Sequence, residues 1–155
     1  MDKQVIEFDV IKKKIDETSI LNEAIKEIEK ILDVDAIIIL VLFNNNDTPV
    51  TKGIGLPYKD AIRTICMCLS EIEAKRYKNQ KKISDPFPDN PEITNKMEKI
   101  KKDLRINLNA KGVIIVAVNT QINFYISCSC GLSRREQILV FINSLIDISF
   151  ELPND

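Results

Sequence analysis

The amino-acid sequence predicts an α+β fold in which helices flank two β-hairpins. Three observations predict it: apolar stripes with helical spacing recur along the chain, runs rich in β-branched residues lie between them, and polar turns divide these runs into pairs. The chain has 155 residues, of which 45% are hydrophobic, so it is long enough for one domain with a buried core.

The first half of the chain predicts a helix, two strands and a second helix. An apolar stripe from Thr18 to Leu32 indicates an amphipathic helix, and residues 1–17 are expected to form an extension or a lead-in helix. The run AIIILVLF at 36–43 lacks a helical period and predicts a largely buried strand, and VTKGIGL predicts the next strand after the turn NNNDTP. Pro57 suits a first helical position, and the apolar face behind it predicts a helix over 58–77.

The second half predicts the same order of elements. Asn90 followed by Pro91 is typical of a helix start, because Asn caps the helix and Pro fits its first position. GVIIVAV, NTQIN and FYISCSC predict a hairpin, and Ser133 with Glu136 forms a capping box that opens the last helix.

A shift of 76 residues places the two halves on each other. Ten residues over 18–72 are identical to the residue 76 positions later, and these include Gly55 and Leu56 on Gly131 and Leu132. The match has two interpretations: an internal duplication, or two segments that share composition, since most of the identities are Ile or Leu. We favour shared composition, because repeat architectures normally contain three or more units.

Composition and charge exclude several functional classes. Lys and Arg number 22 against 23 acids, so the chain has no global basic field and no nucleic-acid partner is expected; the basic cluster at 78–82 is interpreted as a solvated loop. The longest apolar run has eight residues, far fewer than the roughly 20 that a membrane span needs. The N-terminus lacks the apolar segment of a secretory signal, so a cytoplasmic location is expected.

The cysteines form two C-x-C pairs, Cys66 with Cys68 and Cys128 with Cys130. In a reducing compartment they stay thiols, and we expect no disulfide framework. Cys66 and Cys68 point about 200° apart on a helix, so the pair is poorly suited to one metal ion and no metal site is expected. We interpret the cysteines as small buried hydrophobes, with a reactive redox-sensing thiol as an alternative.

The ordered set of motifs resembles a GAF domain over residues 18–152. LNEAIKEIEKILDVDAIIILVLFNNNDTPVTKGIGLP is similar to the opening of that family, in which a helix feeds a strand, a polar turn and a strand closing on Gly-Leu. KKISDPFPDNPEI is similar to the segment before the helix that covers the family's ligand pocket. GVIIVAVNTQINFYISCSCGLSRREQILVFINSLIDISFEL resembles the last hairpin and the C-terminal helix.

The resemblance implies a three-layer α/β/α fold with a central antiparallel sheet. The N- and C-terminal helices are expected on one face, and the middle helices and loops over the other, where they form a pocket. In the last strand Tyr125, Ser127 and Ser129 alternate with an apolar set, so they are expected to face this pocket. Asp85 and Phe87 are expected lid contacts. The alternative is that the polar row meets solvent on an empty sheet.

Departures from the family narrow the expected function. The chain lacks the NKFDE-type signature of cyclic-nucleotide-binding members and has no histidine, which excludes histidine-ligated haem and the Cys-His pair of bilin-binding members; the cofactor stays unknown. It also lacks the tryptophan and the cysteine-bearing segment of the free methionine sulfoxide reductases. Without a Gly-rich phosphate loop or a serine elbow, no enzymatic activity is expected.

We therefore expect a small-molecule-sensing regulatory module that serves signal transduction and binds its ligand without catalysis. In the family that the chain resembles, the first and last helices commonly pair between subunits. The apolar stripes on 20–32 and 138–148 allow such pairing, so a homodimer is expected. The alternatives are a pocketless protein-interaction or dimerisation module and a thiol redox sensor.

Overall fold

The computed structural model describes residues 2–44, 49–77 and 89–150, with the backbone alone for 2–15 and 75–77. These residues form helices and strands in the order that the sequence predicts. The elements are α1 (Asp2–Ile31), β1 (Ala36–Phe43), β2 (Val50–Ile54), α2 (Tyr58–Tyr77), α3 (Pro91–Asn107), β3 (Ala110–Asn119), β4 (Phe124–Cys130) and α4 (Arg134–Phe150).

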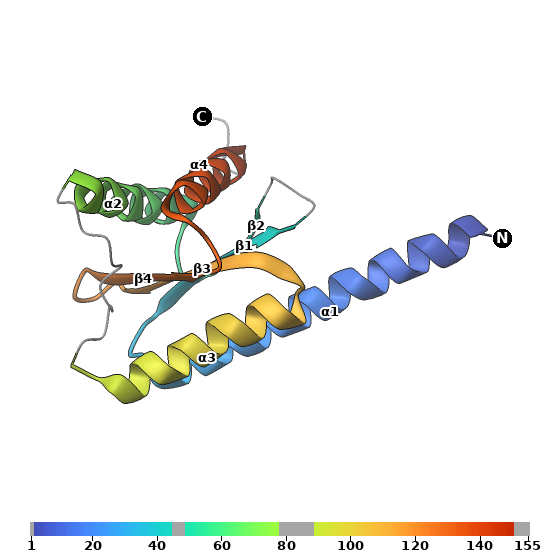
Figure 1. Cartoon of the computed structure of the whole chain (residues 1–155), viewed down its shortest axis with the longest axis horizontal. Coiled ribbons are helices and arrows are strands. Elements are labelled where there is room, and N and C mark those ends of the chain that lie inside the picture. The colour runs from blue at the N-terminus through green and yellow to red at the C-terminus, as the bar shows by residue number, and fades with distance from the viewer. Residues whose placement is uncertain (1, 45–48, 78–88, 151–155) are drawn as a thin grey trace.

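An antiparallel sheet with the strand order β2-β1-β3-β4 forms the middle layer (Figure 1). Its central strands, β1 and β3, are buried along most of their length because helices cover both faces. The predicted α+β class with a central antiparallel sheet is therefore confirmed, and so is the buried strand at 36–43.

Helices α1 and α3 lie on one face of the sheet, and α2 and α4 lie on the other (Figure 1). Ile37 and Ile39 of β1 point into the core beneath α1 and α3, whereas Ile38 and Leu40 point into the core beneath α2 and α4. The expectation that the first and last helices share a face is wrong, because α1 packs on α3 and α4 packs on α2.

The shift of 76 residues relates the two halves as complete structural units. In the β1–β2 ladder Ile37 pairs with Ile54, and in the β3–β4 ladder Val113 pairs with Cys130, which are the residues 76 positions later. Helix α4 begins 76 residues after helix α2 begins. The two halves are thus two αββα units with the same internal register.

Ile39 pairs with Ile115, its own equivalent, in the β1–β3 ladder. The flanking pairs are equivalent to each other: Ile38–Val116 and Leu40–Ile114. A pseudo-two-fold axis therefore passes between Ile39 and Ile115, normal to the sheet. Such an axis turns each face of the sheet onto itself, so equivalent helices share a face. This symmetry is the physical reason that α1 lies beside α3 rather than beside α4.

Two equivalent glycines, Gly55 and Gly131, support duplication over shared composition. Both adopt left-handed backbone conformations, with φ of 78° and 74°. A Cβ at Gly55 would lie 2.1 Å from the carbonyl oxygen of Asp35, and one at Gly131 would lie 2.4 Å from that of Lys111. Because Asp35 and Lys111 are also 76 residues apart, the two identities serve the same backbone contact.

Both predicted helix starts of the second half are confirmed. Asn90 caps α3, since its Oδ1 accepts a hydrogen bond from the Ile93 amide at 3.2 Å. Ser133 and Glu136 form the capping box of α4: the Ser133 amide donates to Glu136 Oε2 at 2.8 Å, and the Glu136 amide donates to Ser133 Oγ at 3.3 Å.

Helix α1 runs without a break from Asp2, so residues 2–17 belong to the same helix as the predicted stripe. Its N-terminal part projects beyond the sheet and α3 (Figure 1). None of the described helices combines the length and the apolar character that a bilayer span requires.

Candidate functional site

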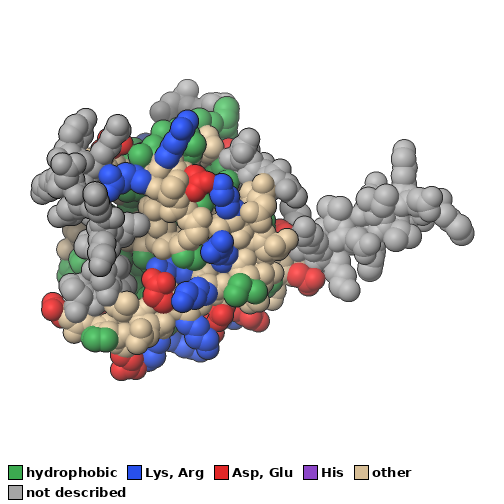
Figure 2. Space-filling view, in the orientation of Figure 1, with side chains coloured by type: hydrophobic (Ala, Val, Ile, Leu, Met, Phe, Trp, Pro, Cys, Tyr) green, Lys and Arg blue, Asp and Glu red, His purple; other side chains and the backbone are tan. Residues whose placement is uncertain are grey.

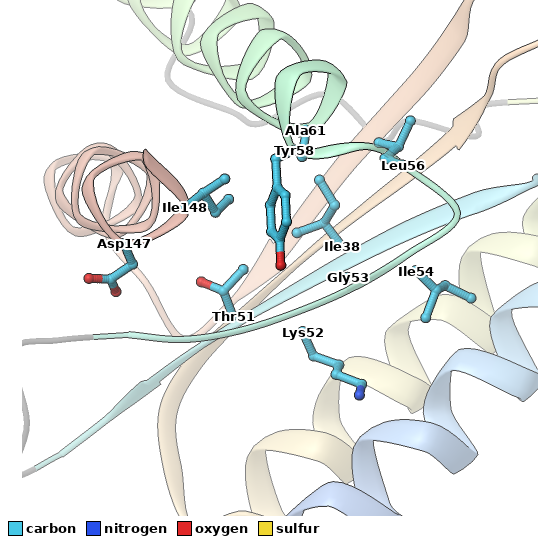
Figure 3. Close-up of a pocket in the computed structure, with 10 residues that line it drawn as sticks. All are labelled: Ile38, Thr51, Lys52, Gly53, Ile54, Leu56, Tyr58, Ala61, Asp147 and Ile148. Carbon is cyan, nitrogen blue, oxygen red and sulfur yellow. The ribbon is translucent and has the colours of Figure 1, made fainter. Parts of the chain in front are cut away.

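A cavity of about 430 Å³ lies between strand β2, the start of α2 and the end of α4 (Figure 3). Its walls are apolar and come from separate elements: Ile38 of β1, Leu56 of the loop before α2, Ala61 of α2 and Ile148 of α4. Small-molecule sites commonly have about 300–1,000 Å³ and mainly apolar walls. The cavity thus has the size and lining of a ligand site.

Polar groups border this cavity at Thr51, Tyr58 and Asp147. Thr51 Oγ1 donates to Ser144 Oγ at 3.2 Å, and this bond ties the edge strand β2 to α4. The Tyr58 ring is half exposed and extends from the start of α2 towards β2 (Figure 3). The exposed Asp147 carboxylate stands on the α4 side. A ligand could therefore meet both hydrogen-bond donors and acceptors at the border.

Lys52 also borders the cavity, but its side chain belongs to the other face of the sheet. Side chains alternate along a strand, and Lys52 pairs with Ile39, whose side chain lies in the core beneath α1 and α3. Thr51 and Gly53 flank Lys52 and face α2 and α4. Asp147 is therefore the charged side chain on the cavity's own face of the sheet.

The equivalent place in the second half carries larger side chains. Gly53 corresponds to Ser129 and Ala61 corresponds to Gln137, each 76 residues later. Gln137 is buried, and its Nε2 donates to the carbonyl oxygen of Leu132 at 3.3 Å. The short residues of the first half leave space where Gln137 places an amide side chain in the second.

The bond between Thr51 and Ser144 also has an equivalent in the other half. Ser127 hydrogen-bonds to the Cys68 thiol, and both residues lie 76 positions from one member of the first pair. Each edge strand is thus tied to the helix of the opposite half. This reciprocal arrangement holds α4 over β2, where it forms one wall of the cavity.

Three predicted site residues, Tyr125, Ser127 and Ser129, lie on the same face of the sheet as the cavity but in the opposite half. Tyr125 borders a second hollow of about 220 Å³, and its hydroxyl donates to Glu71 Oε1 at 2.8 Å. Burial, together with this bond to Glu71, raises the pKa of Tyr125. The other predicted residues, Asp85 and Phe87, lie outside the described residues.

Sequence reasoning missed the residues that shape the larger cavity, above all Gly53 and Ala61. Neither residue carries a reactive or strongly polar group, so neither suggested a site. The signal that could have found them is the comparison of the two halves, which aligns Gly53 with Ser129 and Ala61 with Gln137.

The two cysteine pairs point to opposite sides of the sheet. Cys68 lies in the core beneath α2 and α4, and Cys128 lies in the core beneath α1 and α3. Burial raises the pKa of Cys68 to about 12 and that of Cys128 to about 11. The sheet therefore separates the thiols of a four-cysteine site. In the described part of the chain, no group of three or more His, Cys, Asp or Glu residues is placed to hold a metal ion.

Basic and acidic side chains are interspersed over the face of the molecule in Figure 2. Comparisons of the chain with models of protein families, with curated proteins and with solved structures find no match. The fold and the site define an α+β domain of two αββα units with one ligand-sized cavity of about 430 Å³ among the described residues.

Proposed function

We propose that this protein is a regulatory module that binds a small organic molecule in the cavity beside β2, without transforming it. The observation that carries the proposal is a cavity of about 430 Å³ that Gly53 and Ala61 leave open where Ser129 and Gln137 stand in the other half. The resemblance of the sequence to GAF domains supports the same function, since such domains commonly sense small molecules.

The chemistry of the border supports binding rather than catalysis. Thr51 already donates its hydroxyl proton to Ser144, which does not favour a nucleophilic role. The chain has no histidine, the residue that most often serves as a general base. The polar groups can instead orient a ligand by accepting and donating hydrogen bonds.

The walls suggest a ligand with an apolar body and a polar end. Ile38 and Ile148 are almost fully buried and favour an aliphatic or aromatic body. Asp147 accepts hydrogen bonds and carries a negative charge, so it favours a hydroxyl or ammonium group. The module is proposed to act in the cytoplasm, where a reducing environment suits its four free cysteines.

Native mass spectrometry of the purified protein tests this proposal, with Ala61→Gln as the decisive variant. The substitution introduces the residue of the other half, whose amide can bond to the Leu56 carbonyl as Gln137 bonds to the Leu132 carbonyl. We expect wild-type protein to carry extra mass that is lost on denaturation, and Ala61→Gln protein to lack it.

The matched control is Gln137→Ala, which shortens the equivalent residue in the other half and should retain the extra mass. If Ala61→Gln protein is folded and carries the same extra mass as wild type, the ligand lies elsewhere and the proposal is wrong. If no extra mass is found and no member of a fragment library raises the melting temperature of wild-type protein, binding itself is refuted.

A protein-interaction module is the second candidate function, because α4 exposes several large apolar side chains. A homodimer is the form of interaction that we propose for it. Thiol redox sensing stays a prediction: Cys66 is exposed, whereas burial raises the pKa of Cys68, Cys128 and Cys130 and disfavours the reactive thiolate.

A further inference from the structure

Helix α4 is apolar on two opposite faces. Its inner face, which includes Phe141 and Ile148, is buried against the sheet and α2. Its outer face carries a row of large apolar side chains at helical spacing: Leu139, Ile142, Ile146 and Phe150, with exposed fractions of 49%, 41%, 49% and 82%. We call these four residues the α4 stripe. Apolar side chains reach the surface over α4 at the top of Figure 2.

The fold itself does not require the α4 stripe. The equivalent positions on the outer face of α2 are polar, small or charged: Arg63, Cys66, Ser70 and Ala74. These α2 residues are also exposed, so both helices present the same face to the surface. Only α4 of the two equivalent helices has acquired an apolar surface there. Contiguous exposed apolar patches on a protein commonly mark interaction sites.

We infer that the α4 stripe docks on the α4 stripe of a second copy of this chain, with the two helices antiparallel. A two-fold axis at the middle of the stripe places Leu139 of one copy beside Phe150 of the other, and Ile142 beside Ile146. The stripe is therefore self-complementary, as a two-fold interface requires. None of its residues carries a charge that docking would bury.

Charge along α4 favours the antiparallel arrangement. The helix begins with Arg134 and Arg135, and Asp147 lies in its last turns. Antiparallel docking brings the basic start of one helix towards the acidic end of the other, and it also opposes the two helix dipoles. A parallel arrangement would place like charges side by side.

The size of the α4 stripe suits the core of a dimer interface. Its side chains together expose on the order of 400 Å², about half of the roughly 800 Å² that each partner contributes to a standard interface. Polar residues around the stripe supply the remaining area as a rim. This docking does not depend on ligand binding in the cavity.

Sedimentation equilibrium of the full chain tests the inference with paired substitutions. We expect wild-type protein to sediment at twice the chain mass of 17.7 kDa. Ile142→Lys with Ile146→Lys should raise the dimer dissociation constant more than 100-fold and leave a monomer. Cys66→Lys with Ser70→Lys, at the equivalent positions of α2, should leave the dimer intact. Circular dichroism checks that both variants are folded.

Oxidative cross-linking in a Cys66→Ser background tests the antiparallel direction. The pair Ile142→Cys with Ile146→Cys should form a covalent dimer, whereas Ile142→Cys alone should not, since it meets its own copy only in a parallel arrangement. A monomeric wild-type protein overturns the inference. So does a dimer that survives the lysine substitutions in α4 but dissociates with Ile6→Lys and Phe8→Lys, which would place the contact on the first helix.

Discussion

Ala61 and Gln137 occupy equivalent positions in the two halves, yet Ala61 borders a cavity of about 430 Å³ whereas Gln137 is buried and bonds to the Leu132 carbonyl at 3.3 Å. The second half thus shows how the same backbone accommodates a larger side chain at this position. This relationship makes Ala61→Gln a substitution that the fold already tolerates elsewhere in the same chain.

The equivalent glycines Gly55 and Gly131 should be equally intolerant of a side chain. A Cβ at either position would lie within 2.1–2.4 Å of a carbonyl oxygen, at a φ that favours glycine. We expect Gly55→Ala and Gly131→Ala each to lower the free energy of unfolding by roughly 2–3 kcal/mol in urea denaturation. Gly53→Ala is the control, because its Cβ would find its nearest neighbours at 3.9 Å. A loss at Gly53 as large as at Gly55 would contradict this account of the turns.

Phe141 should be essential to the core beneath α2 and α4. It is fully buried, like its equivalent Ile65. Phe141→Ala should lower the free energy of unfolding by about 3–5 kcal/mol, and Phe141→Asp should unfold the domain, because it buries a charge without a partner. Leu139→Ala on the outer face of the same helix should cost less than about 1 kcal/mol. Equal losses at Phe141 and Leu139 would show that α4 packs through a different face.

Glu136 should contribute to stability in a pH-dependent way. Its bonds to Lys111 and to Ser133 lower its pKa from 4.5 to about 2. Because the folded-state pKa is depressed, the contribution is complete above about pH 4.5 and is lost as the pH falls towards 2. Glu136→Gln should therefore lower the urea midpoint at pH 7, and the difference from wild type should disappear near pH 2.

The matched control for this pH dependence is Glu29→Gln on the exposed side of α1, which removes a charge without removing a capping box. A difference between wild type and Glu136→Gln that stays constant from pH 7 to pH 2 would mean that the ionised carboxylate is not the stabilising form.

The elements of this fold could be predicted because their signals are local. The β-branched run 36–43, the cap at Asn90 and the capping box at Ser133 each specify a short segment, and the structure confirms each one. The assignment of helices to faces could not be predicted in the same way. β1 is apolar on both faces, so its sequence does not indicate which helix covers which side.

The candidate site could be predicted only in part. The polar row at Tyr125, Ser127 and Ser129 pointed to the face of the sheet that carries the cavity, but to the other half of the molecule. Reasoning from reactive or polar side chains favours such rows. The cavity instead depends on the atoms that Gly53 and Ala61 lack, which becomes visible only when the halves are compared.

Chemical-shift mapping of ligand contacts is the measurement that tests the central claim most directly. Amide spectra of isotope-labelled protein would be recorded while a library of fragment-sized aromatic and aliphatic molecules is added. We predict that binders shift the amides of Thr51, Gly53 and Ala61, and leave those of the equivalent Ser127, Ser129 and Gln137 unchanged. A library without binders, or shifts centred on the second half, would contradict the assignment of the cavity as the ligand site.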